Sequence, residues 1–360
     1  MRVLWATDRD PWHPRGGGAE KTTYMVTKGL VSRGHQVVVL CGGMRGGDRR
    51  FFDNGVEYHR VALGVGVRAV LPVELRSRDF DFIIDDLAHV IPWFSPKLSS
   101  TLGAAFFRHL HARTLDGQVA SPFSSLLKRV ELTYSRIYRD WRFVTESEQS
   151  VSDLAALGVS RQAISRVPPG VDSDLYHPRE KFPQPTFVYF AGLKKYKRPA
   201  HAIEAAARVR KQTATFRLIV LGVGPELDHL KQMAHDLGLE GIVSFPGRLP
   251  EEELARLVSK CWMNIHLSVA EGWGLSILEA AACGTPTIGY RAPGVEEAIE
   301  DGRTGILVPN GDVERLSSAM IDGLTVREEF RNNCRNRALS FPWDTTVSGW
   351  EKVIRGLANA

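Results

Sequence analysis

The sequence predicts an α/β protein of two domains, each built on a parallel sheet covered by helices. The chain has 360 residues, which is more than one hydrophobic core comfortably serves. Short β-rich runs alternate along it with helical stripes, an order typical of parallel sheets. A stretch with five prolines, residues 167–185, interrupts the alternation near the middle and is typical of an interdomain linker.

The composition is that of an ordinary soluble globular protein, with 43% hydrophobic and 24% charged residues. The four cysteines form no CxxC pair, which argues against a zinc site or a redox dithiol and favours a reducing compartment. The first apolar run is too short for a signal peptide, and no stretch approaches the roughly 20 apolar residues of a membrane span. We therefore expect a cytoplasmic protein with no transmembrane segment.

The formal net charge of +5 arises in the first half, where residues 1–168 hold 23 basic and 17 acidic residues. Such an excess suits an acidic partner or an anionic membrane face, so peripheral membrane contact stays open. The sequence has no RNP, KH or zinc-finger signature, and we expect no nucleic-acid partner.

The first half begins with strand, glycine loop, helix and strand. The runs "RVLWA" and "QVVVL" flank a glycine triplet and an apolar stripe of helical spacing that ends at Gly34. In such a βαβ unit, ligands collect at the carboxyl ends of the strands. Further on, the apolar residues of segment 126–141 recur every three or four positions. They predict one amphipathic helix that packs on the core, or alternatively an interfacial or partner-binding face.

The second half repeats the period after the proline-rich stretch. Its predicted strands are "TFVYFAG", "RLIVLGVG", "IVSFPG" and "MNIHLSV", and its predicted helices span about 199–210, 226–237 and 251–260. The run "EGWGLSILEAAACGTPTIG" follows and holds two carboxylates, Glu271 beside a glycine turn and Glu279 eight residues on. We expect the first to be exposed and the second to be buried on a helix over 276–283.

Those features together suit a nucleotide sugar. Glycines let the backbone approach a ligand closely, and free N–H groups at a helix start attract phosphate. The two glutamates would lie up to roughly 12 Å apart along a helix axis, near the hydroxyls at either end of such a ligand. Surface glutamates that merely flank a loop are the alternative.

The same run resembles the E-x7-E signature of family 4 of the retaining glycosyltransferases. The segments "HPRGGGAEKTTYMVTKGLVSRGHQVVVL" and "FVYFAGLKKYKRPAHAIEAAARV" are also similar to that family, and further matches follow in family order. The resemblance implies the GT-B fold: two Rossmann-like parallel-sheet domains facing across a cleft, with a C-terminal helix returning to the N-terminal domain. The implied boundaries are an acceptor-binding domain at 1–168, a linker at 169–185, a donor-binding domain at 186–340 and the helix at 341–360. A cap of the second domain is the alternative for that helix.

The resemblance also assigns roles within the donor site. Glu279 would bind the ribose, Glu271 a sugar hydroxyl, and Lys197 the diphosphate. The other implied donor residues act largely through backbone or charge, and they are Gly16, Gly17, Gly18, Lys194, Lys195, Gly222, Gly224, Arg248, Gly272, Trp273, Gly274 and Leu275. The catalytic candidates are Glu271, Lys197, His109 and His111. A solvated lysine and simple turn or loop glycines are the structural alternatives for Lys197 and the glycines.

Three positions depart from the family pattern. Gly192 stands where relatives often carry an arginine beside the diphosphate, and Lys194 or Lys195 would have to substitute. The family's N-domain histidine corresponds to His109 or His111, with Arg108 competing for the same place. Ser276 replaces a frequent proline.

Asp79-Phe80-Asp81 matches a metal-binding D-x-D pattern, but the run continues as a buried strand bracketed by acids. We therefore expect neither a metal nor a cofactor. The sequence predicts a retaining, metal-independent transferase that moves a hexose or N-acetylhexosamine, UDP-linked by preference, to an unknown hydroxyl acceptor. Natural product, polysaccharide precursor and lipid all remain open as acceptors. The alternatives are a relative making a disaccharide or pseudo-sugar coupling, and a non-catalytic nucleotide-sugar-binding protein.

Overall fold

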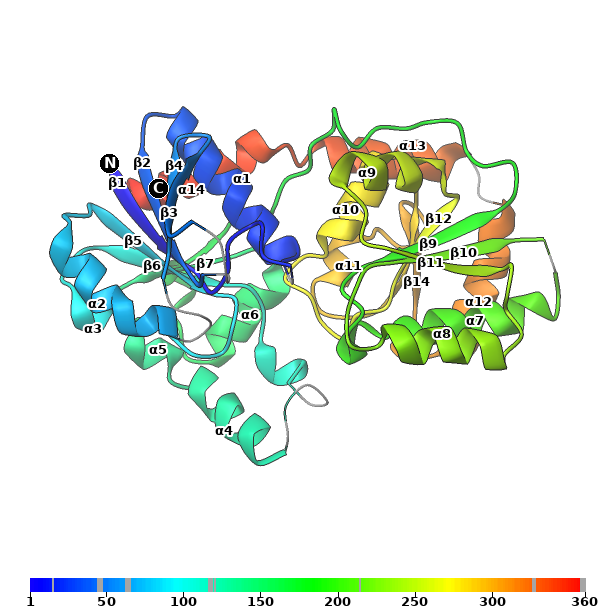
Figure 1. Ribbon diagram of the computed structural model, residues 1–360, viewed down its shortest axis with the longest axis horizontal. Coiled ribbons are helices and arrows are strands. Elements are labelled where there is room, and N and C mark those ends of the chain that lie inside the picture. The colour runs from blue at the N-terminus through cyan, green and yellow to red at the C-terminus, as the bar shows by residue number, and fades with distance from the viewer. Residues whose placement is uncertain are drawn as a thin grey trace. The chain divides into compact units, whose positions relative to one another are not determined.

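The computed structural model describes residues 1–14, 16–43, 48–61, 66–115, 119, 121–213, 215–325 and 328–356. The chain divides into two compact units (Figure 1). Unit 1 comprises Met1–Pro169 and Trp343–Ala360, and unit 2 comprises Gly170–Pro342. Each unit has its own sheet, with helices on both faces.

The sheet of unit 1 has eight strands in the order β3-β4-β2-β1-β5-β6-β7-β8. They are β1 (Arg2–Ala6), β2 (Gln36–Cys41), β3 (Arg50–Asp53), β4 (Val56–Arg60), β5 (Phe82–Leu87), β6 (Gly103–Phe107), β7 (Arg142–Thr145) and β8 (Ile164–Arg166). All neighbours are parallel, as predicted, except β3 and β4. These two form a hairpin whose turn residues Asn54 and Gly55 have φ values of 48° and 78°, which suits an Asn-Gly pair.

Helices cover both faces of that sheet, and the sheet separates two cores. They are α1 (Gly18–Ser32), α2 (Val67–Ser77), α3 (Ser95–Leu98), α4 (Ser121–Glu131), α5 (Tyr134–Ile137), α6 (Glu148–Ala156) and α14 (Trp343–Ile354), with short 3-10 turns at His111–Arg113 and Arg161–Ala163. Side chains alternate along β1, so Val3 and Trp5 pack toward α1 and α14. Leu4 and Ala6 pack on the other face, toward α2, α5 and α6.

The C-terminal helix α14 packs on unit 1, so the predicted return of this helix to the N-terminal domain is confirmed. The ring of Trp350 lies 4.8 Å from that of Trp5 and 4.8 Å from that of Phe106, centroid to centroid. Gly29 of α1 permits the approach, because a Cβ there would lie 2.4 Å from Cγ2 of Val347.

Segment 126–141 differs from the single helix predicted for it. The helix α4 ends at Glu131, and the short α5 follows after a break. The buried carboxylate of Glu131 accepts hydrogen bonds from the backbone N–H groups of His111 and Ala112, while Tyr134 and Tyr138 are held in the core further along. The apolar stripe therefore serves the core in its second half, whereas Leu126 on α4 is 59% exposed.

The sheet of unit 2 has six parallel strands in the order β11-β10-β9-β12-β13-β14. They are β9 (Thr186–Phe190), β10 (Arg217–Leu221), β11 (Val243–Gly247), β12 (Met263–His266), β13 (Thr287–Tyr290) and β14 (Gly305–Val308). The helices are α7 (Pro199–Arg210), α8 (Leu227–Asp236), α9 (Glu251–Lys260), α10 (Leu275–Ala282), α11 (Val295–Ala298), α12 (Val313–Asp322) and α13 (Glu328–Leu339), with 3-10 turns at Lys195–Lys197 and Gly323–Thr325.

Unit 2 is a three-layer sandwich, with α7, α8 and α12 on one face of the sheet and α9, α10 and α13 on the other (Figure 1). The proline-rich stretch from Gly170 onward packs on the second of these faces. Tyr176 is buried there, and the N–H of Phe182 donates to the carbonyl of Lys260 at 2.8 Å. Most of this stretch is therefore part of unit 2 and not a free connection.

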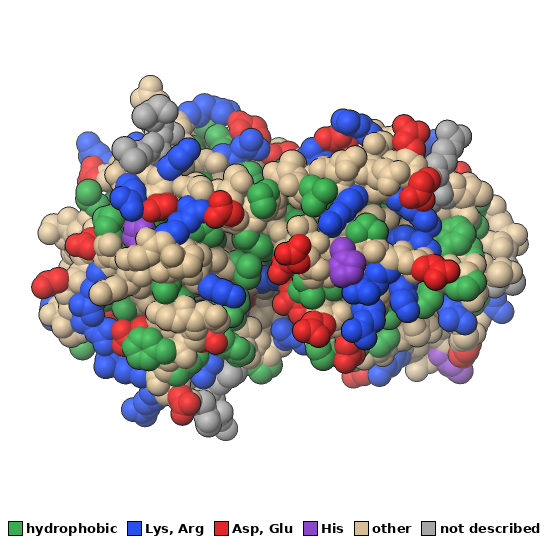
Figure 2. All heavy atoms as spheres, turned by 90° about the horizontal axis from the view of Figure 1, so that it is seen from above, with side chains coloured by type: hydrophobic (Ala, Val, Ile, Leu, Met, Phe, Trp, Pro, Cys, Tyr) green, Lys and Arg blue, Asp and Glu red, His purple; other side chains and the backbone are tan. Residues whose placement is uncertain are grey.

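On the surface drawn in Figure 2, both units carry Lys and Arg as well as Asp and Glu side chains. Within the described residues, no helix combines the length and the apolarity that a membrane crossing requires.

Strand β5 buries an acid, Asp85, that has no basic partner in hydrogen-bonding contact among the described residues. Asp85 accepts a hydrogen bond from Oγ of Ser95 at 2.5 Å, and its Oδ2 lies 2.9 Å from the hydroxyl of Tyr138. Burial outweighs these hydrogen bonds and raises the pKa of Asp85 to about 7. The group keeps its proton in the folded protein at pH values where the unfolded chain, with a pKa near its ordinary value, has lost it.

This difference predicts a specific pH dependence of stability. Between about pH 4 and pH 7 the unfolded state binds fewer protons than the folded state at Asp85, so the free energy of unfolding falls as pH rises, by at most about 1.4 kcal/mol per unit. Asp85→Asn removes this titration, and its pH profile should be flatter across that window. Denaturant unfolding at a series of pH values measures the slopes, and parallel profiles for the two proteins would contradict the assignment.

Candidate functional site

The predicted donor residues of unit 2 gather where the strand order of its sheet reverses. From β9 the chain proceeds to β10 on one side, and it later returns to the other side of β9 as β12. Open parallel sheets bind ligands in the crevice outside the carboxyl ends of strands at such a switch point. Lys197 lies in the loop after β9, and Glu271 lies in the loop after β12.

These two residues form an ion pair that joins the two loops. The Nζ of Lys197 donates to Oε1 of Glu271. The backbone supports the pair, because the hydroxyl of Tyr189 donates to the carbonyl of Lys197 at 2.9 Å and the N–H of Val269 donates to the carbonyl of Tyr196 at 3.0 Å. Charge and main-chain contacts therefore fix the same geometry.

The pair is mostly buried, with 16% of the Lys197 side chain and 14% of the Glu271 side chain exposed. Burial alone would raise the pKa of Glu271, but Lys197 and then His266 outweigh it and hold the pKa well below its usual range. Burial would likewise lower the pKa of Lys197, and the Glu271 carboxylate raises it instead. Both groups are charged at neutral pH. The expectation of an exposed Glu271 is wrong, because Lys197 and the surrounding loops cover it.

A second loop braces the backbone of Glu271. Its N–H donates to the carbonyl of Pro293 at 3.0 Å. Gly294 follows with φ of 77°, and a Cβ at this position would lie 2.3 Å from the carbonyl oxygen of Glu271. A glycine is required here by both the dihedral and the close approach.

The helix α10 begins directly after the Gly-Trp-Gly turn. Its N-cap, Gly274, has φ of 87°, which only glycine adopts without strain. The N–H groups of Gly272, Trp273 and Gly274 donate to no backbone acceptor within the described part of the chain. The Trp273 ring is buried against Phe341 at 5.3 Å, so only the backbone of Trp273 faces the turn.

Glu279 lies on α10 and is buried, 7% exposed, as predicted. Burial, and then the carboxylates of Glu279 and Glu251, raise the pKa of the buried Tyr176 phenol. The glycine turn and both glutamates of the E-x7-E run thus occupy one loop and one helix at the switch point.

The loops after β9 and β10 pack backbone to backbone. A Cβ at Gly222 would lie 2.0 Å from the carbonyl oxygen of Ala191, and one at Gly224 would lie 2.2 Å from that of Leu193. The two glycines are therefore needed for contact between the loops. Gly192 is exposed, and a Cβ there would meet only Cε of Lys194, at 3.9 Å.

Three basic candidates differ in exposure. Lys195 and Arg248 are exposed, the first on the loop after β9 and the second just beyond β11. Lys194 is half-buried, and its Nζ lies 5.9 Å from the centroid of the Tyr196 ring.

Gly16, Gly17 and Gly18 lead into α1 in unit 1, after the carboxyl end of β1. The N–H of Gly16 donates to the carbonyl of His13 at 2.7 Å, and the N–H of Gly17 donates to Oε2 of Glu20 at 2.7 Å. The start of this helix is thereby capped by its own glutamate.

Of the two histidine candidates, His111 is held at both ring nitrogens. Its Nδ1 lies 3.2 Å from Oε1 of Glu131, and its Nε2 lies 3.1 Å from the carbonyl oxygen of Ala88. Such bonding suits a structural role for His111. The ring of His109 packs 4.6 Å from that of His111, centroid to centroid.

Arg108, the third candidate for that position, is a buried structural residue. It pairs with Asp86, with a shortest distance of 2.7 Å, and with Glu146 at 3.3 Å. The same guanidinium donates to the hydroxyl of Thr23 on α1 at 3.0 Å. Asp81 of the D-x-D pattern accepts from the backbone N–H of Arg2 at 2.6 Å and ties down the end of β1.

Sequence reasoning missed two residues that contact this site, His266 and Gly294. The Nε2 of His266 lies 3.3 Å from Oε1 of Glu271, and its Nδ1 lies 3.1 Å from Oγ of Ser276. The position of His266 could have signalled it, since this histidine ends a buried strand five residues before Glu271.

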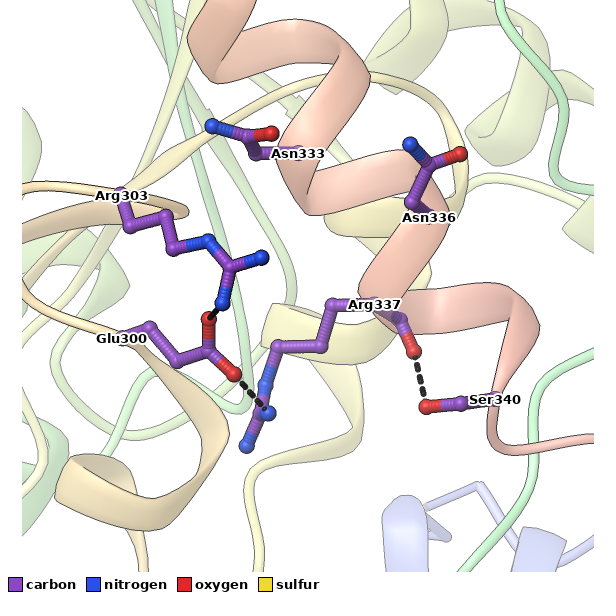
Figure 3. Close-up of a pocket in the computed structure, with 6 residues that line it drawn as sticks. All are labelled: Glu300, Arg303, Asn333, Asn336, Arg337 and Ser340. Carbon is purple, nitrogen blue, oxygen red and sulfur yellow. Dashed lines mark hydrogen bonds and ion pairs between the residues drawn. The ribbon is translucent and has the colours of Figure 1, made fainter.

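A separate polar pocket of about 230 Å³ lies between α13 and the segment before β14. It is lined by Glu300, Arg303, Asn333, Asn336, Arg337 and Ser340. Figure 3 shows both arginines bonded to the one carboxylate of Glu300. None of the predicted donor residues belongs to this pocket.

Two family models match the chain in succession. The model described as "Glycosyltransferase Family 4" matches residues 16–175, and the one described as "Glycosyl transferases group 1" matches residues 173–341. Both halves of the chain are thus accounted for by glycosyltransferase domains.

Relatives of known name agree. The chain is 32% identical to a D-inositol 3-phosphate glycosyltransferase of Acidothermus cellulolyticus over 237 residues, 59% of this chain and 53% of that protein. It is 28% identical over 340 residues to a GDP-mannose-dependent alpha-(1-6)-phosphatidylinositol monomannoside mannosyltransferase of Mycolicibacterium smegmatis, with 86% of each chain covered. The chain therefore spans about half the length of the first of these relatives and most of the second.

Solved structures share the fold. Sucrose-phosphate synthase from Thermosynechococcus elongatus superposes with a TM-score of 0.85 at 18% identity and covers 99% of both chains. The Anabaena protein HepE in complex with UDP-glucose gives a TM-score of 0.78 at 18% identity, with 100% of both chains covered. The two matched domains, the two Rossmann-like sheets and the returning α14 lead to one conclusion: the chain belongs to the family 4 glycosyltransferases and has the GT-B fold.

Proposed function

We propose that the protein is a retaining, metal-independent hexosyltransferase that takes its sugar from a nucleoside diphosphate sugar. The observation that carries the proposal is the buried Lys197–Glu271 pair at the switch point of unit 2, directly beside the start of α10. The cation and the N–H groups at the helix start can bind the diphosphate of such a donor, and the carboxylate can bind a hydroxyl of its sugar.

Each group has a distinct task in the proposed reaction. The Lys197 ammonium and the N–H groups at the start of α10 stabilise the negative charge that grows on the diphosphate as it departs. The carboxylate of Glu271 orients the sugar by accepting a hydrogen bond from a hydroxyl. Glu279 accepts hydrogen bonds from the ribose. The acceptor hydroxyl attacks from the face that the leaving group vacates, and a phosphate oxygen takes its proton, so the anomeric configuration is retained.

The same charge balance supports the proposed metal independence. Lys197 and the helix amides supply the positive potential that a divalent ion would otherwise provide at the diphosphate. The reaction should therefore proceed unchanged in the presence of a chelator.

The donor base and the acceptor are the open parts of the proposal. UDP-linked hexoses and N-acetylhexosamines are the donors that the sequence favours, and the name of the mycobacterial relative adds GDP-mannose. The names of the two relatives also make inositol phosphate and a phosphatidylinositol glycoside the first acceptors to test. A natural product or polysaccharide precursor comes next.

One experiment separates a transferase from a non-catalytic nucleotide-sugar-binding protein. The second is considered because position 192 is a glycine where relatives often carry an arginine. Purified protein with chelator present is given UDP-glucose, UDP-N-acetylglucosamine or GDP-mannose, alone and with each acceptor. Release of nucleoside diphosphate that depends on the acceptor supports the transferase. Donor binding without turnover across all acceptors would favour the binder, and an absence of donor binding would refute both.

The role of Glu279 predicts a selective loss of donor affinity. Glu279→Ala should weaken binding of the nucleotide sugar by about 10-fold to 100-fold, since hydrogen bonds to a charged group contribute about 1.5–3 kcal/mol. Glu314→Ala, at an exposed position in the first turn of α12, is the matched control and should bind donor normally. Calorimetric titration gives the affinities. Equal affinities in the two variants would remove Glu279 from the site.

The open space at Gly192 predicts a gain of affinity. Gly192→Arg adds a guanidinium where nothing obstructs a side chain, and it should tighten binding of the nucleoside diphosphate by about 10-fold through charge-assisted hydrogen bonds. Gly192→Gln adds a shorter, uncharged polar side chain and should leave the affinity near that of the parent. If both variants bind alike, the diphosphate does not lie within reach of position 192.

A further inference from the structure

A buried histidine stands behind the carboxylate of Glu271. His266 is the last residue of β12 and is 4% exposed. Its Nε2 lies 3.3 Å from Oε1 of Glu271, and its Nδ1 lies 3.1 Å from Oγ of Ser276 in the first turn of α10. Gly274 of the Gly-Trp-Gly turn lies beside the ring, since a Cβ at this position would lie 3.7 Å from Nε2.

In the part of the chain that the structure describes, Lys197 and His266 approach the Glu271 carboxylate at the same oxygen. The Nζ of Lys197 and the Nε2 of His266 each lie against Oε1. Neither uses Oε2, which is thereby the oxygen available to accept a hydrogen bond from a ligand. Both contacts of this carboxylate therefore lie at Oε1.

Those two contacts differ in how they respond to a bound diphosphate. The ammonium of Lys197 sits on a flexible stem and is drawn toward new negative charge, so its hold on Glu271 weakens when the donor enters. The ring of His266 belongs to a buried strand and is fixed at Nδ1 by Ser276, so it stays. With the Ser276 hydroxyl donating to Nδ1, the proton of a neutral ring is on Nε2. This buried nitrogen makes no hydrogen bond within the described part of the chain, although it lies 3.3 Å from Oε1, so it is a donor still to be satisfied when the carboxylate turns.

We infer that His266 is a positioning residue that holds the carboxylate of Glu271 toward the donor sugar after Lys197 has engaged the diphosphate. The inference rests on the proposed function. His266 touches no substrate in this arrangement. It acts by fixing the rotation of a group that does, and through Ser276 it also ties that group to the helix whose amides bind phosphate.

Two replacements of His266 separate this role from simple packing. The amide nitrogen of His266→Gln lies near the place of Nε2 and keeps a donor toward Glu271. In His266→Asn the amide lies near the place of Nδ1, so the contact with Ser276 is kept and the one with Glu271 is lost. We expect the Gln variant to keep kcat within about 3-fold of the parent and the Asn variant to lose about 10-fold to 100-fold, because misplacement by about 1 Å costs that much.

A binding measurement supplies the readout that a structural defect would not give. We expect both variants to bind the nucleoside diphosphate, which lacks the sugar, with the affinity of the parent, and only His266→Asn to bind the nucleotide sugar more weakly. Ser276→Ala, which frees the ring at Nδ1, should show a milder form of the Asn pattern and provides the test if His266→Asn does not fold. Melting temperatures are recorded for all three.

Two results would overturn the role of His266, and a third would overturn the proposed function. Equal kcat and sugar-donor affinity in the Gln, Asn and Ala variants and the parent would overturn the inference. So would equal losses of nucleoside diphosphate and nucleotide-sugar binding with a lowered melting temperature in both His266 variants, which is the mark of a packing residue. If the parent itself neither binds nor turns over any nucleotide sugar, the proposed function fails and the role of His266 fails with it, whereas an active parent with unchanged variants overturns the role of His266 alone.

Discussion

The ion pair of Lys197 with Glu271 is the constraint on which the candidate site depends. Two buried charges are costly to desolvate, and the cost is offset only when the geometry is good and further hydrogen bonds help. Here those supports come from every side: Tyr189 holds the carbonyl of Lys197, Pro293 accepts from the backbone of Glu271, and His266 lies against its carboxylate. Removing one partner would leave the other as an unpaired buried charge.

The strand order of the unit 2 sheet explains the position of the Lys197–Glu271 pair. Strands β9 and β12 are neighbours, yet the chain between them passes through β10 and β11 on the far side of β9. Their following loops therefore meet only at this point, and the Val269–Tyr196 hydrogen bond closes the contact. Unit 1 also contains a buried basic side chain, but with a different set of partners. Its buried cation, Arg108, is bound by two carboxylates, Asp86 and Glu146, and it joins β6 to the first helix through Thr23.

The elements of regular period could be predicted from the sequence. The strands of both βαβ repeats and the helices at 199–210 and 251–260 match the structure closely, because apolar spacing and the glycine and proline punctuation agree there. The hairpin at Asn54-Gly55 carries its own signal, an Asn-Gly pair between short β-rich runs. The break between α4 and α5 had no local signal, since it depends on the long-range bonding of Glu131 to the backbone near His111.

The sequence could predict which residues of unit 2 lie at the candidate site, but it could not predict their ion pairs or their burial. Spacing places Glu271 and Glu279 on one loop and helix, but it carries no information about which groups pair across loops that are 74 residues apart in the chain. The burial of Glu271 by Lys197, the bracing by Gly294 and the contact of His266 all arise between segments that only the folded sheet brings together. For the same reason the sequence alone does not show that His266, at the end of β12, contacts the site, whereas His109 and His111 were candidates by their resemblance to the family.

The glycines after β10 restrict which substitutions this edge of the sheet accepts. Any side chain at Gly222 or Gly224 would collide with a carbonyl of the adjoining loop, so replacements at these two positions would disturb the fold. Val223 stands between them with 45% of its surface free. Val223 can therefore be replaced by other residues, whereas Gly222 and Gly224 on either side of it cannot.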